Sequence, residues 1–168
     1  MQQLSKEQVL KIMERYGNNP QQLIAVLLDI QEASCKNYVE RQWAELASDV
    51  LNIPLSKIYD ILTFYAMFSA EPRGEYVIEI CRSTPCHFIR TQEAVKWFEE
   101  ETGITMGETS ADGMFTLSFT NCVGACDIGP VAVIGEDVFG NLTQEKVKTL
   151  VKHCRDRNKQ ELQSLCQN

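Results

Sequence analysis

Two closely spaced pairs of cysteines constrain this chain more than any other feature of its sequence. The first pair bounds the segment CRSTPC at residues 81–86, and the second bounds CVGAC at residues 122–126. Each pair begins where a predicted β-strand ends, so the two loops are expected to meet at one edge of a sheet. Pro85 and Gly124 suit loops whose backbone must bend around an inorganic core. The pattern predicts a metal site on Cys81, Cys86, Cys122 and Cys126.

The spacing within the pairs leaves three kinds of chemistry open. A 2Fe-2S cluster needs four thiolates, two for each iron, and plant-type ferredoxins also use a four-residue gap. A structural zinc site uses four cysteines in two short-spaced pairs as well, although most such pairs enclose two residues, whereas these enclose four and three. A thiol-disulfide enzyme is the third option, and the missing C-x-x-C motif argues against it. Spacing alone favours the iron-sulfur cluster over zinc only weakly.

Composition and charge exclude several other functions. Seven cysteines in a chain without a secretory signal indicate a reducing, cytoplasmic compartment. A net charge of -7 would repel a phosphate backbone, so nucleic acid is not an expected partner. No apolar run approaches the roughly 20 residues of a membrane helix, so membrane insertion is not expected. No glycine-rich loop joins a strand to a helix, so the sequence contains no recognisable dinucleotide-binding motif.

Residues 1–71 carry the pattern of four short amphipathic helices. The first begins at a capping box formed by Ser5 and Gln8. The fourth is expected to run from about Ser56 through Met67, after the punctuation of Pro54. Apolar residues recur at helical spacing in each segment, and the loops between the segments are short. We therefore expect an N-terminal four-helix bundle.

Composition changes near residue 71, where SAEPRGE ends the helical pattern and a β-rich segment begins. The second domain, 72–155, has strand and helix signals in the order β-α-β-β-β-α. A helix between the first two strands permits a parallel pair, and the later hairpin adds antiparallel strands. The fold class is therefore α+β, a helical bundle followed by a domain that resembles a small thioredoxin-like sandwich. Residues 156–168 form a polar C-terminal tail without an assigned function.

The segments around the cysteines also resemble a known family. IPLSKIYDILTFYAMF, then CRSTPC, then 35 residues, then TNCVGACDIGPVAVI is similar to the small thioredoxin-like 2Fe-2S subunit of NADH-oxidising complexes. That family includes the peripheral subunit of respiratory complex I and the matching subunits of NADH-linked hydrogenases, electron-bifurcating ones included, and formate dehydrogenases. The resemblance runs from the helical bundle to about residue 155.

The resemblance implies one 2Fe-2S cluster held by Cys81, Cys86, Cys122 and Cys126. It implies an electron-relay subunit without catalytic residues in an NADH-dependent oxidoreductase complex. FMN and NAD(H) are then expected on a larger flavin- and NADH-binding iron-sulfur partner, with a further catalytic subunit such as a hydrogenase. The lack of a presequence and of a membrane anchor leads us to expect a prokaryotic complex that is cytoplasmic or peripheral to the membrane. Among such complexes we favour a soluble NADH-linked hydrogenase or related reductase. The same relay role in respiratory complex I, peripheral to the membrane through partners, and a redox-inactive zinc-stapled interaction module are the alternatives.

Smaller expectations concern residues outside the four ligands. Cys35 and Cys154 are expected to be packing residues and Cys166 an exposed thiol, while Gly129 stands where the family has alanine. Phe64, Tyr65 and Phe68 are expected to pack in the core or between domains. Backbone amides around Thr84 and Gly124 are predicted to point at the cluster or at cysteine sulfurs, and so to stabilise the reduced state.

Overall fold

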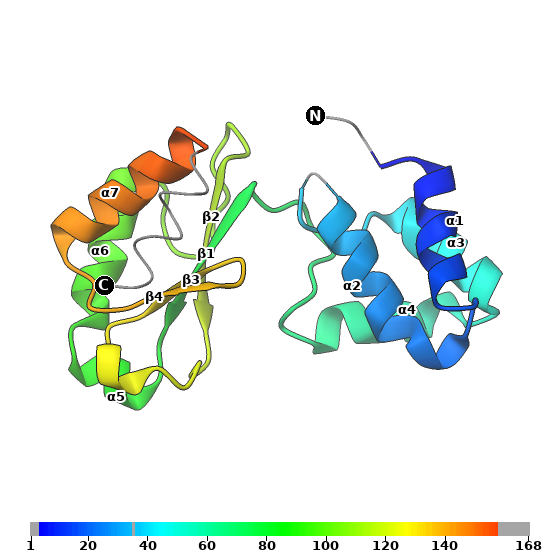
Figure 1. Cartoon of the computed structure of the whole chain (residues 1–168), viewed down its shortest axis with the longest axis horizontal. Coiled ribbons are helices and arrows are strands. Elements are labelled where there is room, and N and C mark those ends of the chain that lie inside the picture. The colour runs from blue at the N-terminus through cyan, green and yellow to red at the C-terminus, as the bar shows by residue number, and fades with distance from the viewer. Residues whose placement is uncertain (1–3, 35, 158–168) are drawn as a thin grey trace. The chain divides into compact units, whose positions relative to one another are not determined.

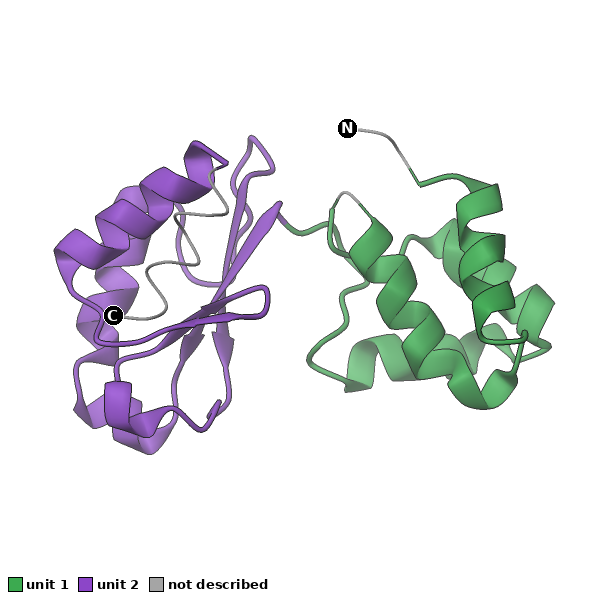
Figure 2. Cartoon of the chain, in the orientation of Figure 1, with its two compact units in different colours: residues 1–73 green, residues 74–168 purple. Residues whose placement is uncertain are grey.

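The computed structural model describes residues 4–34 and 36–157 of the 168-residue chain. The chain divides into two compact units, Met1–Arg73 and Gly74–Asn168 (Figure 2). The sequence placed the domain boundary at residue 71, two residues earlier than this division. In the described part of the chain, no helix combines the length and the apolar character needed to cross a membrane. Of the three cysteines without a family role, Cys35 and Cys166 lie outside the described residues.

The first unit is a bundle of helices whose boundaries follow local signals. Its elements are α1 (Lys6–Arg15), the 3-10 turn η1 (Pro20–Gln22), α2 (Leu23–Ala33), α3 (Arg41–Leu51) and α4 (Leu55–Phe64) (Figure 1). The capping box predicted for α1 is present: the Gln8 amide donates to Ser5 Oγ, and the Ser5 amide donates to the Gln8 side chain. Apolar side chains from all four helices form one core, including Val9, Met13, Val26, Leu27, Ile30, Ala44, Ala47, Leu51 and Ile58.

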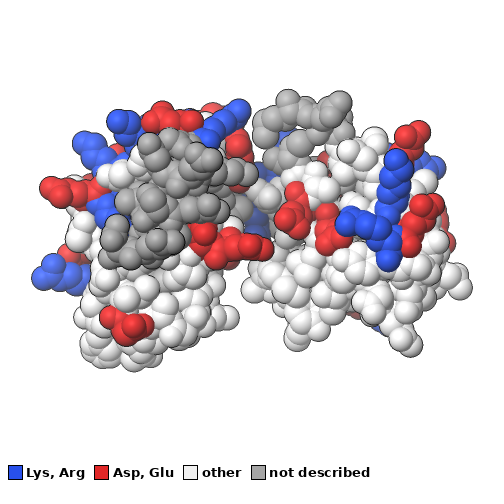
Figure 3. Space-filling view, in the orientation of Figure 1, with Lys and Arg blue, Asp and Glu red and all other residues white. Residues whose placement is uncertain are grey.

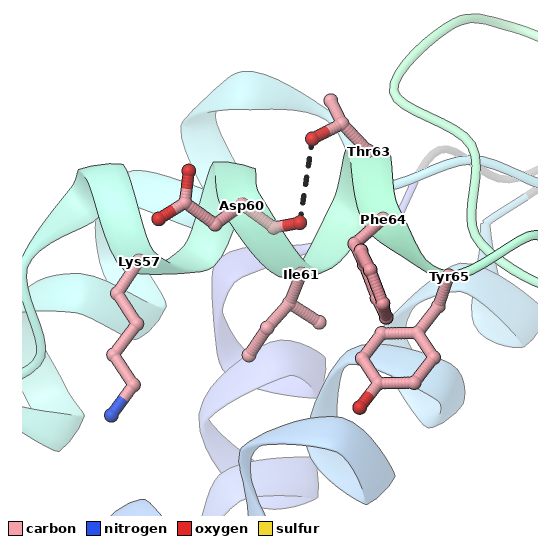
Figure 4. A pocket seen from close by; sticks show the side chains of 6 residues that line it. All are labelled: Lys57, Asp60, Ile61, Thr63, Phe64 and Tyr65. Atoms are coloured by element: carbon pink, nitrogen blue, oxygen red, sulfur yellow. Dashed lines mark hydrogen bonds between the residues drawn. The ribbon is translucent and has the colours of Figure 1, made fainter.

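α4 ends earlier than its apolar pattern indicated. The helix stops at Phe64 and the chain is extended at Tyr65, whereas the sequence predicted helix through Met67. Phe68 is buried in the bundle core, as expected, whereas Phe64 is 80% exposed and so does not pack in that core. Packing of Phe64 between the domains stays a prediction. Phe64 and Tyr65 meet edge to face and border a surface hollow of about 620 Å³ along α4 (Figure 4).

The second unit is built on a four-stranded sheet in the order β2-β1-β3-β4. Its elements in chain order are β1 (Tyr76–Cys81), α5 (Thr84–Phe88), α6 (Thr91–Thr102), β2 (Phe115–Thr120), the 3-10 turn η2 (Cys126–Ile128), β3 (Ala132–Ile134), β4 (Asp137–Phe139) and α7 (Gln144–Arg155). β1 pairs parallel with β2, and α6 belongs to the connection between these two strands. β3 pairs antiparallel with both β1 and β4. The predicted pairing of the sheet is thus confirmed. The short elements α5 and η2 were not predicted.

α6 and α7 lie side by side on one face of this sheet (Figure 1). The sequence pattern predicts a helix from Thr91 to Thr102 that ends at Gly103, and α6 has these bounds. Gly103 ends the helix in the left-handed conformation that glycine adopts readily. The sequence also predicts Thr143 as the N-cap of the last helix, and its hydroxyl accepts from the Lys146 amide at the start of α7. The core between sheet and helices holds Ile78, Ile80, Phe98, Phe115, Leu117, Phe139, Leu150 and Cys154 among others. Cys154 is therefore a packing residue, as the sequence indicated.

Candidate metal centre

The parallel pairing of β1 and β2 brings the two cysteine loops to the same edge of the sheet. Cys81 is the last residue of β1, and its partner in the register is Thr120, the last residue of β2. Cys86 lies in α5, directly after β1, and Cys122 lies in the loop that leaves β2. Cys126 is the first residue of η2. Four residues separated by up to 45 positions in sequence thus lie at or just after two adjacent strand ends.

The four thiols form two neighbouring pairs. Cys122 Sγ and Cys126 Sγ are 3.6 Å apart. The thiols of Cys81 and Cys86 are hydrogen-bonded to each other, and Cys86 and Cys126 are close enough to interact electrostatically. Among residues 4–34 and 36–157, no three His, Cys, Asp or Glu side chains converge on a single ion position. The contact between Cys122 and Cys126 and the hydrogen bond between Cys81 and Cys86 thus define two pairs of sulfurs.

This donor set fits a binuclear iron-sulfur cluster. Two sulfurs bound about 2.3 Å from one tetrahedral ion stand about 3.7 Å apart, close to the 3.6 Å between Cys122 and Cys126. In a 2Fe-2S cluster each iron takes two protein thiolates, so two neighbouring pairs supply the full protein ligation. A single tetrahedral zinc ion would instead need all four sulfurs around one centre. The arrangement fits the two-iron group better.

The two pairs differ in their exposure to solvent. Cys81 and Cys86 are each 1% exposed and pack with Val131 in a small apolar cluster, whereas Cys122 is exposed and Cys126 half-buried. Burial raises the pKa of Cys86 to about 11. The Gly124 amide, donating to Cys122 Sγ, lowers the pKa of that thiol, and the bond with Cys122 raises the pKa of Cys126. We call Cys81 and Cys86 the inner pair and the other two the outer pair.

Two backbone amides and one hydroxyl donate hydrogen bonds to the cysteine sulfurs. Gly124 has a φ of 85°, a left-handed conformation, and its N–H donates to Cys122 Sγ as predicted. Ser83, in the first loop, also donates its hydroxyl to Cys122. Val131 donates its N–H to Cys86 Sγ and accepts from the Cys81 amide at 3.0 Å. The amide of Thr84 stays a prediction.

The roles of Val131 and Ser83 were missed by reasoning from sequence. Val131 acts through its backbone, and the VAVI segment carried only a strand signal. Ser83 could have been suspected because a hydroxyl within CRSTPC lies three residues or fewer from both cysteines. A short polar side chain in such a loop commonly bonds a neighbouring acceptor. Loop hydroxyls beside cysteine ligands are thus worth testing as sulfur donors.

The Gly140→Ala substitution is expected to disturb the outer pair. An added Cβ would lie 2.5 Å from two side-chain carbons of Ile128, which ends η2 and packs against the inner cysteines. Because this packing positions Cys126 at the start of the same turn, overpacking should cost about 1–3 kcal/mol of stability and reduce iron content. Thermal melting and iron analysis of the purified protein would measure both effects.

Gly129→Ala is the matched control for Gly140→Ala. At position 129 an added Cβ would meet Cys86 Sγ and the Cys126 carbonyl at 3.5 Å, which is ordinary van der Waals contact. Both melting temperature and iron content should therefore stay close to those of the unmodified chain. Equal effects of the two substitutions would contradict the packing role assigned to Gly140. The same geometry leaves room at position 129 for the alanine that the family resemblance leads one to expect.

The chain is similar in sequence to proteins of a known family. The family model for the thioredoxin-like 2Fe-2S ferredoxin matches residues 9–155. Subunit HndA of the NADP-reducing hydrogenase of Solidesulfovibrio fructosivorans is 30% identical over 144 residues, covering 86% of this chain and 83% of that protein. A subunit of the NADH-quinone oxidoreductase of Rickettsia felis is 32% identical over 145 residues, covering 86% of each protein.

A solved structure shares the fold over most of the chain. The NAD+-reducing NiFe-hydrogenase in its air-oxidized state matches with a TM-score of 0.74 at 19% identity. This match covers 84% of the present chain but only 24% of the much longer hydrogenase chain. Sequence and fold together lead to one conclusion: the chain belongs to the thioredoxin-like 2Fe-2S ferredoxin family.

Proposed function

We propose that this chain is the electron-relay subunit of a multi-subunit NADH-linked oxidoreductase and holds one 2Fe-2S cluster on Cys81, Cys86, Cys122 and Cys126. The observation that carries the proposal is the pairing of the four thiols at one sheet edge, with two of them buried, one half-buried and one exposed. Family membership and relatives that are named hydrogenase and NADH-quinone oxidoreductase subunits support it. The chain's part in the reaction is transfer of electrons without a catalytic acid, base or nucleophile.

The chain's residues have defined tasks in this role. A bound 2Fe-2S cluster supplies reversible one-electron chemistry. The inner pair, with Val131, excludes water from one side of the site. Gly124, Val131 and Ser83 donate hydrogen bonds to ligand sulfurs, and such donors favour added negative charge. The outer pair, with its exposed Cys122, gives the site its open side.

Exposed apolar side chains lie within or next to the ligand loops in the sequence. Among the described residues, exposed large hydrophobics fall in two groups: Phe64, Tyr65 and Met67 on the first unit, and Phe88, Ile89, Phe119 and Val123 on the second. Each member of the second group, which we call the collar, lies within three residues of a proposed ligand along the sequence. On the face seen in Figure 3, the end of the second unit around α5 shows mostly uncharged atoms.

The collar supports a permanent partner over a diffusing carrier. Carriers that dock transiently are commonly steered by charge, whereas permanent interfaces bury more apolar surface. An electron leaves through the surface that a partner covers closely, because tunnelling weakens steeply with distance. We therefore place the larger flavin- and NADH-binding subunit, with FMN and NAD(H) on it, against the collar. A further catalytic subunit, such as a hydrogenase, completes the assembly.

The assembly we favour is a cytoplasmic hydrogenase or related reductase. The named relatives include both a hydrogenase subunit and NADH-quinone oxidoreductase subunits, so the relay role in respiratory complex I is the second candidate. Co-purification from the source cells through a tag on this chain would separate the two. A hydrogenase subunit among the captured proteins supports the first, and a membrane-bound quinone reductase supports the second.

Metal and sulfide analysis of anaerobically purified protein tests the cluster itself. We expect about two irons and two acid-labile sulfides per chain, with a visible spectrum that bleaches on reduction and a paramagnetic signal in the reduced state. Zinc without sulfide would contradict the electron-relay role and would indicate an interaction module whose fold is stabilised by a zinc ion. Disulfide reductase activity that survives removal of metal would instead indicate thiol chemistry.

A further inference from the structure

Thr91 joins the start of a helix to the backbone of an inner ligand. It is the first residue of α6 and is 3% exposed. Its hydroxyl donates to the carbonyl of Cys81 at 3.2 Å, in a buried position. The residue before it, Arg90, has a φ of 75° and offers no side-chain cap to the helix. The one buried hydroxyl at this helix start is thus used on the ligand strand.

The bond completes the backbone pairing of Cys81 at the end of β1. The Cys81 amide donates to the Val131 carbonyl at 3.0 Å, and the next amide, that of Arg82, donates to Thr120 at 3.2 Å. The β1–β3 register ends at Ile80 and Ala132. A buried carbonyl beyond a ladder needs another donor. Thr91 supplies that donor.

The bond also closes the loop that carries the second inner ligand. Residues 82–90 connect β1 to α6 and contain Cys86 within α5. One end of this loop is fixed by the sheet, and the Thr91 hydroxyl ties its other end back to Cys81. The separation of the two inner sulfurs therefore depends on a contact that neither cysteine makes through its own side chain.

We propose that Thr91 is a positioning residue, whose hydroxyl bond to the Cys81 carbonyl holds the inner cysteine pair in the geometry required by the cluster. The inference rests on the proposed function, because it takes both cysteines as ligands. Thr91 touches neither thiol in this role. Its influence reaches the cluster through the strand end and the loop, so it should change properties of the bound group without changing its stoichiometry.

Thr91→Val tests the proposal, because valine keeps the shape of threonine and lacks the hydroxyl. We expect the variant to bind the cluster but to release iron to a chelator about tenfold faster, since an unpaired buried carbonyl weakens the closed loop. Its reduction potential and its electron paramagnetic resonance spectrum should shift with the ligand geometry. Thr91→Ser keeps the hydroxyl, so its iron release rate, reduction potential and spectrum should match those of the unmodified protein.

Thr102→Val is the matched control on the same helix. Thr102 ends α6, and its hydroxyl bonds the Phe98 carbonyl at 2.6 Å, away from the ligand loops. This variant is expected to leave the potential, the spectrum and the release rate unchanged, with at most a small change in melting temperature. A merely structural role for Thr91 would produce that same pattern in Thr91→Val and would overturn the proposal.

Further outcomes keep the proposal distinct from the assignment of the cluster. If Thr91→Val fails to fold, Thr91→Ser still decides: a shifted potential and faster iron release in the serine variant would show that the hydroxyl is not the group that acts. Unmodified protein purified without iron and sulfide would contradict the proposed function. Unmodified protein with a normal cluster, together with an unchanged Thr91→Val cluster, would contradict only the role of Thr91.

Discussion

Replacing Cys86 with alanine is expected to abolish stable cluster binding. Cys86 is 1% exposed and lies in an apolar cluster with Cys81 and Val131, so no water can take the vacated ligand position easily. Loss of an outer-shell partner alone costs metal sites about 10–100-fold in affinity, and loss of a ligand should exceed that range. Iron content and visible absorbance of the anaerobically purified variant would measure the loss.

Two other cysteine variants serve as comparisons for Cys86→Ala. Cys122→Ser places an oxygen ligand at the exposed outer position and is expected to keep an altered, more labile cluster. Cys154→Ala removes a thiol that is fully buried against α6 and the sheet, and whose pKa burial raises to about 12. That variant should keep its iron and lose only packing stability. Iron loss in Cys154→Ala equal to that in Cys86→Ala would undermine the ligand assignment.

Substitutions of two phenylalanines in the second unit are expected to have different effects, one on stability and the other on partner binding. Phe98 on α6 is fully buried in the core, and its replacement by alanine should cost about 3–5 kcal/mol of unfolding free energy. Phe88 at the end of α5 is 82% exposed, so Phe88→Ala should change stability by less than about 0.5 kcal/mol. Its effect should appear instead as about tenfold weaker binding to the flavin subunit.

Denaturant unfolding and binding to the isolated partner subunit measure the two effects separately. Phe64→Ala, which removes an equally exposed ring from the first unit, is the control for loss of exposed aromatic surface as such. We expect it to leave binding of the collar's partner unchanged. Wild-type affinity in Phe88→Ala would remove the collar from the interface, and an equal loss in Phe64→Ala would show that the effect is not specific to the ligand end.

Much of the fold was predictable because its signals are local. Ser5 with Gln8, Gly103 and Thr143 mark helix ends through their own side-chain or backbone chemistry, and the structure places the ends there. The elements that were missed have three to five residues, too few for helical periodicity to appear. α4 was predicted too long because an apolar pattern continues past Phe64 although the backbone turns there.

The candidate site also contains residues that local signals predict and residues that only tertiary contacts bring together. The four cysteines could be chosen from their spacing and from the strands before each pair. The donors around them could not, because Val131 acts through backbone groups whose direction depends on the pairing of β3 with β1. The contact of Thr91 with Cys81 likewise joins residues ten positions apart that become neighbours only when α6 packs on the sheet.

The parallel pairing of β1 and β2 has a consequence for the order of assembly. The inner pair comes from one continuous segment of the chain. The outer pair reaches the same place only after the chain has passed through α6 and β2 has paired with β1. Such non-local strand pairing forms late in folding, because the intervening chain must first be ordered. Cluster insertion should therefore follow completion of the sheet, and a loaded site would report that the second unit has finished folding.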